Sequence, residues 1–179
     1  MENQDDSLVQ NETLESIYDV EEQKVISLNK FIFLSIISFG LYEIWWIYKT
    51  WRFFNQKEKL NINSALRTIF SIFFLISLFN KILRFAKEKG YCNNFPSVLL
   101  FVGYILINYT AYLPDPFWLI RILGFMFLMP QFIALKYAKL NSTDFIITVQ
   151  TSFNYRQIVL IVVGAILWAL VLLNLIISD

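Results

Sequence analysis

The chain has 179 residues, of which 57% are apolar and 16% charged, against ~45–50% and ~25% in ordinary soluble domains. Polar side chains are too few to cover this apolar content in water, so the composition excludes an ordinary soluble domain and favours a protein that lies partly in lipid. The net charge is only +1, and the sequence has one cysteine and no histidine, which excludes an internal disulfide and removes the commonest metal ligand.

The N-terminal residues are strongly acidic. Residues 1–23 contain eight Asp and Glu residues and no Lys or Arg. A secretory signal needs a basic start and a small-residue cleavage site, and neither is found here. We therefore expect residues 1–27 to be a retained, largely disordered tail, and residues 28–179 to be a single transmembrane helical domain.

Apolar segments dominate the rest of the chain. A helix that crosses a bilayer needs about 20 apolar residues, with ~17 as the lower bound. The second segment is too short by this measure, and the others are long enough. The sequence predicts an all-α, polytopic transmembrane protein with four to five apolar segments: 31–48, 68–79 (continuing weakly to 85), 95–113, 117–135 and 158–177.

The connectors differ in length and charge. Leu113–Pro116 is a tight turn in which two prolines surround one aspartate. Lys139–Gln157 is the longest interior connector, and its FIITV stretch fits either a short strand or a patch at the lipid interface.

The basic residues of the connectors permit three topologies, because Lys and Arg in short loops prefer the cytoplasm. If all segments span, the connector after residues 31–48 lies outside with five cations, against this preference. If residues 68–79 do not span, only the two cations of the tail lie outside. If residues 31–48 also fold back at Gly40, all fourteen connector cations lie inside. All three place the Pro-Asp-Pro turn and the C-terminus outside.

The region from Ser77 to Lys89 has the pattern of an amphipathic helix. Its polar residues are spaced by three and four positions, and apolar residues fill the opposite face. The basic polar face suits anionic lipid head groups. We expect Thr68–Phe79 to dip into the membrane and Asn80–Lys89 to lie along its inner surface.

Glu43 is the leading candidate for a functional site, because a carboxylate inside an apolar segment is costly. It lies six residues before Lys49, about 9 Å along a helix, and so is expected near the inner edge of the membrane. There it can form a structural pair with Arg67, or it can belong to a site. Both interpretations stay open.

Other polar and aromatic positions have simpler explanations. Arg121 fits an arginine that reaches the outer interface, and alternatively an anion site. Asn108 and Gln131 fit hydrogen bonds between helices, although a kink at the neighbouring Pro130 could open a pathway. An aromatic belt at the head groups is predicted for Trp45, Trp46, Tyr48 and Trp51.

No motif for catalysis or cofactor binding is present, which predicts a protein that is not an enzyme and has no cofactor. The expected partners are membrane lipids, with a second copy of the chain or another membrane protein as further possibilities, and no nucleic acid. The predicted function is contact within the membrane; the alternative is a small transporter, channel or lipid-handling protein.

Four stretches of sequence resemble a known family. They are KFIFLSIISFGLYEIWWIYKTWRFF, LRTIFSIFFLISLFNKILRFAKEKGY, MPQFIALKYAKLN and YRQIVLIVVGAILWALVLL. The chain is similar over residues 30–177 to small uncharacterised bacterial multi-pass membrane proteins that share a domain of unknown function, although their proline-rich stretch before the glutamine is longer. The resemblance implies the bacterial inner membrane, and it carries over no activity and no functional residues.

Overall fold

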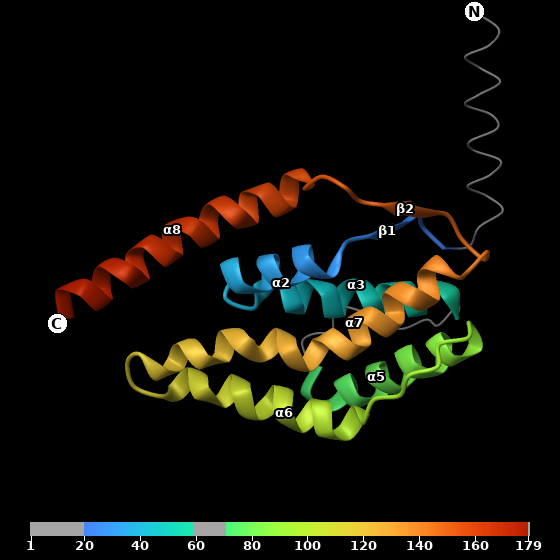
Figure 1. The fold of residues 1–179 in the computed structure, drawn as a ribbon, viewed down its shortest axis with the longest axis horizontal. Helices are drawn as coiled ribbons and strands as arrows, with labels where there is room; N and C mark the ends of the chain where they lie inside the picture. Colours follow the sequence, from blue (N-terminus) through green and yellow to red (C-terminus); the bar gives the residue numbers. More distant parts are fainter. Residues whose placement is uncertain (1–19, 59–70, 179) are drawn as a thin grey trace, which may run out of the picture.

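The structure is a computed structural model that describes residues 20–58 and 71–178. These residues form a bundle of helices with two short strands at one end, and the last helix runs along the outside of the bundle (Figure 1). This mostly helical architecture confirms the predicted all-α class.

The apolar run of residues 31–48 is divided between two helices. Helix α2 covers Leu28–Ile37 and helix α3 covers Leu41–Lys57. Between them Phe39 has a φ of 52° and Gly40 a φ of 85°, the left-handed conformation that glycine adopts without strain. Of the alternatives that the sequence leaves open, the structure therefore has the fold-back at Gly40.

The hairpin of α2 and α3 is held by a cap and by stacked rings. The Ser38 hydroxyl accepts a hydrogen bond from the Tyr42 amide at 3.0 Å, and this satisfies one free donor at the start of α3. The Phe31 ring lies 5.8 Å from the ring of Trp46 on the returning helix. It also stacks on Phe132 of α7 (Phe125–Leu140) at 4.5 Å.

The expected aromatic belt is only partly present. Trp46 and Trp51 are 8% and 2% exposed and belong to the core, whereas Trp45 is exposed. The two buried rings lie on the side of α3 that packs against the bundle, so their role is packing within the protein.

Helix α5 covers Ser71–Glu88 without a break at Phe79 and packs against α7. Its apolar face is buried by protein, and it runs beside α7 (Figure 1). The predicted amphipathic pattern is therefore confirmed, but the expected change of direction between residues 79 and 80 is not found. The buried residues of this face are Leu75, Leu78, Phe79, Ile82, Phe85 and Ala86.

Four helical elements lead to the Pro-Asp-Pro turn and back. Gly103 allows close packing between two of them, because a Cβ there would lie 2.1 Å from the Phe127 ring. The elements are α6 (Ser97–Tyr109), η1 (Thr110–Tyr112), η2 (Phe117–Gly124) and α7 (Phe125–Leu140).

Two short strands join the N-terminal segment to the connector after α7. Strand β1 (Gln23–Val25) pairs in parallel with β2 (Ile147–Val149). Val25, the last residue of β1, and the following Ile26 are buried. The end of the segment expected to be disordered, residues 1–27, is thus ordered from residue 20 onward, and FIITV contributes a strand.

Helix α8 (Tyr155–Ser178) touches the bundle mainly through α2. A Cβ at Gly164 would lie 2.1 Å from the Ile37 carbonyl oxygen, so glycine is what permits this approach. The Trp168 indole donates a hydrogen bond to the Ile36 carbonyl at 3.3 Å.

By length and composition, two of the described helices can cross a membrane. They are Phe117–Leu140, with 44% of its apolar window buried in the protein, and Tyr155–Ile177, with 6% buried. The expected number of four to five spanning segments is therefore too high. Residues 31–48 are interrupted at Gly40, and the apolar helix Ser97–Tyr112 is shorter than a full span.

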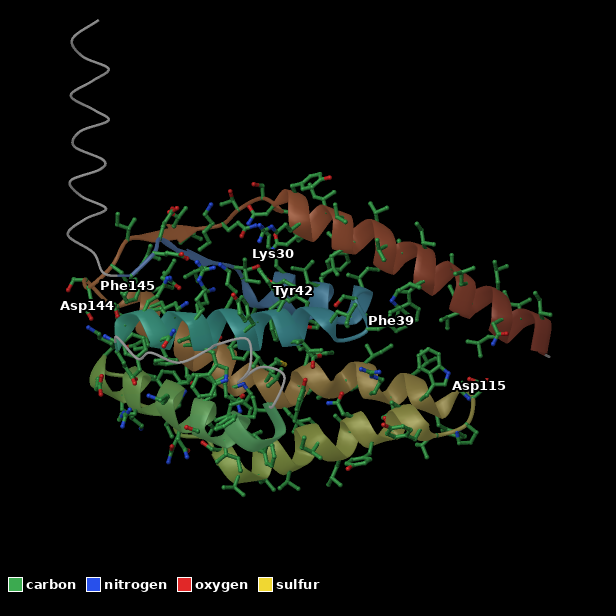
Figure 2. All side chains as sticks on the ribbon, turned by 180° about the vertical axis from the view of Figure 1, so that it is seen from behind. Lys30, Phe39, Tyr42, Asp115, Asp144 and Phe145 are labelled. Carbon is green, nitrogen blue, oxygen red and sulfur yellow. The ribbon has the colours of Figure 1, made fainter. Side chains whose placement is uncertain are left out.

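The two ends of the bundle differ in character. The strands lie at one end together with Asp144 and Phe145, whereas Asp115 of the Pro-Asp-Pro turn lies at the other (Figures 1 and 2). We call the first of these the basic end, because Lys57 and Lys89 meet there at Asp144.

Candidate functional site

A cleft opens at the basic end between β1, α3, α7 and the start of α8. Its volume is about 520 Å³, within the ~300–1,000 Å³ of typical ligand sites. Its wall has six cations and only two carboxylates. This basic cleft is lined by Lys24, Lys49, Arg52, Lys136, Lys139 and Arg156, by Glu21 and Glu22, and by the aromatic residues Tyr42, Trp45, Trp46, Phe53, Phe132 and Tyr155.

Most of these positive charges are not neutralised within the cleft. Arg52 forms an ion pair with Glu21. The Lys49 ammonium instead lies 5.8 Å from the ring centre of Trp45. Within residues 20–58 and 71–178, the other cations of the cleft have no ion pair. The cleft therefore presents an unbalanced positive wall.

Lys139, near the end of α7, contacts both β1 and α3 across the cleft. Its ammonium donates a hydrogen bond to Gln23 Oε1 of β1 at 2.7 Å and lies 4.3 Å from the ring centre of Phe53. An ammonium has three donors, so this arrangement leaves donor capacity for a ligand.

The pKa of Lys49 reflects the excess of cations. Burial lowers this pKa most, and the charges of Arg52, Arg156 and Lys24 lower it further, while Glu21 acts in the opposite sense. An anion bound beside Lys49 would favour its charged form, because opposite charges stabilise each other.

Hydrogen bonds fix the rim of the cleft. The Gln157 amide donates to the Tyr42 hydroxyl at 3.3 Å, and the Lys30 ammonium donates to the Gln150 carbonyl at 3.2 Å. Lys30 and Tyr42 both lie on the hairpin side that faces the start of α8 (Figure 2). The connector before α8 is thus held against the hairpin.

Glu43 is not placed as the sequence predicts. It lies in the first turn of α3 at the hairpin tip, away from the basic end, and is 3% exposed. Its carboxylate lies beside Tyr104 of α6 and Gly124 of η2. The reason is the turn at Gly40. Helix α3 begins directly after this turn, so Glu43 lies in its first turn. Arg67 lies outside the described residues, so the pair with Glu43 stays a prediction.

The other predicted polar positions lie apart from the basic cleft. Arg121 is half-buried and acts electrostatically on Glu43, and its expected position at the outer interface stays a prediction. The Asn108 side-chain amide donates a hydrogen bond to the Tyr104 carbonyl of its own helix at 2.8 Å. The prediction that this amide bonds to another helix is therefore wrong. Gln131 is fully buried, and its amide has no hydrogen-bond partner in the described part of the chain.

The sequence interpretation missed the cleft itself. Its signal was present, because WWIYKTWR places Lys49 and Arg52 among aromatic residues. The belt interpretation explained these residues without a site. The contributions of Lys139 and Arg156 had no local signal, since they depend on how α7 and α8 meet α3.

Among residues 20–58 and 71–178, no group of three or more His, Cys, Asp or Glu side chains is placed to hold a metal ion. Comparison with protein-family models, with curated proteins and with solved structures finds no match for this chain.

Proposed function

We propose that this chain is a multi-pass protein of the bacterial inner (cell) membrane that binds the anionic head group of a lipid in its basic cleft. It acts through contacts with lipid and not through catalysis. The resemblance over residues 30–177 supports the bacterial membrane. The preference of Lys and Arg for the cytoplasm places the basic end inside, and the Pro-Asp-Pro turn and the C-terminus outside.

The position of the cleft cations that have no ion pair among the described residues carries this proposal. Lys139 lies near the end of the candidate span Phe117–Leu140, and Arg156 near the start of the candidate span Tyr155–Ile177. Both therefore lie at the level where a bilayer has its phosphates. Basic pockets at this level bind anionic head groups, and the neighbouring Trp45 and Tyr155 suit the same depth.

The test compares anionic with zwitterionic lipid. Native mass spectrometry of the detergent-solubilised protein would measure retention of phosphatidylglycerol and of phosphatidylcholine. We expect the double variant Lys49→Gln/Arg156→Gln to weaken phosphatidylglycerol binding by about tenfold or more, since each hydrogen bond to a charged group contributes ~1.5–3 kcal/mol. Arg84→Gln/Lys87→Gln, which removes two exposed cations of α5 outside the cleft, is the matched control.

Two outcomes would overturn the proposal. One is equal retention of both lipids by the wild type. The other is competition by free glycerol phosphate as strong as that by the lipid, which would identify a soluble phosphate compound as the ligand.

A small transporter or channel is the second candidate. Gln131 favours it, because its buried side chain lies next to Pro130 and has no hydrogen-bond partner in the described part of the chain. Flux in liposomes that is lost in Pro130→Ala would support it. Helix α8, with most of its surface free of protein contact, offers a surface for a second copy or another membrane protein, which cross-linking in the membrane would detect.

A further inference from the structure

Glu43 forms a second polar site that is separate from the basic cleft. Its side chain is 3% exposed, and its Oε1 atom has no hydrogen-bond partner among the described residues. Buried carboxylate oxygens normally have partners, because an unmet hydrogen bond in an apolar interior is costly. The site therefore calls for an explanation other than packing.

Polar groups from two further elements converge on the carboxylate. The Tyr104 hydroxyl of α6 interacts with it. At Gly124 of η2, a Cβ would lie 3.4 Å from Glu43 Oε2, 3.5 Å from the Tyr104 ring and 3.6 Å from Asn108 Nδ2. These side chains therefore surround the position that a Cβ of residue 124 would take, and they lie in one compact group.

Among residues 20–58 and 71–178, Glu43 has no ion pair in contact distance. Tyr104 of α6 and Arg121 of η2 are the titratable groups that act on it. Among the described residues, Arg121 has no carboxylate within 4 Å. The N-terminus of α3 adds partial positive charge. These groups act on a carboxylate that is 3% exposed and has no cation in contact among the described residues, so burial disfavours its ionised form, whereas the protonated form is neutral.

Two more buried polar side chains lie in the same interior. Ser35 on α2 and Gln131 on α7 are fully buried and have no side-chain partner among the described residues. Their helices pack together where Phe31 stacks on Phe132, and Phe132 also lines the basic cleft.

We propose that Glu43 is a proton-binding site in the membrane interior, with Tyr104 as the positioning residue that holds its carboxyl group. The proton is the smallest ligand, and it removes the charge of a buried carboxylate whose Oε1 atom has no hydrogen-bond partner among the described residues. This assignment does not depend on what occupies the basic cleft.

The experiment uses dicyclohexylcarbodiimide, which reacts with protonated carboxyl groups in apolar surroundings. The full chain in lipid vesicles is treated over a range of pH, and the adduct is mapped by mass spectrometry of peptides. We expect labelling at Glu43 that declines as pH rises. Glu43→Gln abolishes it, and Glu88→Gln, at an exposed position of α5, leaves it unchanged.

Tyr104→Phe separates a proton site from a structural carboxylate. The Tyr104 hydroxyl stabilises the ionised form by hydrogen bonding, so its removal should extend labelling to higher pH. No adduct at Glu43 in the wild type at any pH would overturn the proposal. So would protection by sodium ions at constant pH, which would make a metal cation the ligand.

Discussion

Asp144 connects two helices at the basic end through its carboxylate. It accepts hydrogen bonds from Lys89, after α5, at 3.0 Å and from Lys57, the last residue of α3, at 3.3 Å. The bond from Lys89, followed by that from Lys57, lowers the pKa of Asp144. Because the pKa is lower in the folded than in the unfolded chain, the contribution to stability is complete above the unfolded value of ~3.9. It is lost as the pH falls through the folded value.

We therefore expect Asp144→Asn to lower the free energy of unfolding at neutral pH and to have no effect at acid pH. The reduction should be small, about 0.5 kcal/mol, because the carboxylate is largely exposed and screened by solvent. Thermal unfolding in detergent at several pH values measures it, with Glu88→Gln, at an exposed position of α5, as the control. A difference that stays the same at acid pH would contradict this account.

Single residues also show where prediction from sequence ends. Glu43 and Gln131 could be identified as polar positions in apolar segments, and both are buried. Their surroundings could not be predicted, because Tyr104 and Gly124 reach Glu43 from elements far along the chain. Asn108 was assigned an interhelical bond, but the carbonyl one turn earlier is the closer acceptor.

At the scale of elements, the contact between α2 and α8 depends on one glycine. The Ile37 carbonyl occupies the place that a Cβ of residue 164 would need, and the rings of Phe39 and Trp168 stack at 4.8 Å beside it. The Ile37 carbonyl belongs to the backbone and not to a flexible side chain, so a side chain at residue 164 would force α2 and α8 apart.

We expect Gly164→Ala to destabilise the protein by about 1–3 kcal/mol, the usual cost of overpacking. The measurement is the midpoint of thermal unfolding in detergent. Ala165→Val is the matched control, because residue 165 is exposed and has room for the extra carbons. Equal midpoints for Gly164→Ala and the wild type would refute the close contact.

The hairpin of α2 and α3 explains why the number of spans was overestimated. An apolar run of this length satisfies the criterion for a spanning helix, and hydropathy does not detect a change of direction. The local signals were Ser38 and Gly40, which supply a cap and a left-handed residue. They were visible in the sequence, but they left both alternatives possible. Packing of Phe31 against Trp46 favours the turn.

At the scale of the whole molecule, the hairpin brings the N-terminal segment to the same end as the connectors rich in Lys and Arg. Strand pairing between β1 and β2 fixes this arrangement. Of the three topologies that the sequence permits, the fold-back at Gly40 occurs in one, which predicts that all fourteen connector cations lie on one side. Lys59 and Arg67 lie outside the described residues, and the orientation in the membrane stays the proposal made above.

Labelling of single cysteines in intact cells tests this orientation. Native Cys92 is exposed, and Ser27→Cys and Asp115→Cys would each be made in a Cys92→Ser background. We expect a membrane-impermeant maleimide to label residue 115 from outside, and residues 27 and 92 only after the membrane is permeabilised. Labelling of residue 27 in intact cells would mean that residues 31–48 cross the membrane, and the hairpin would then be wrong. Failure to label residue 115 would instead place the Pro-Asp-Pro turn away from the outer surface, because the side chain of Asp115 is exposed in the fold.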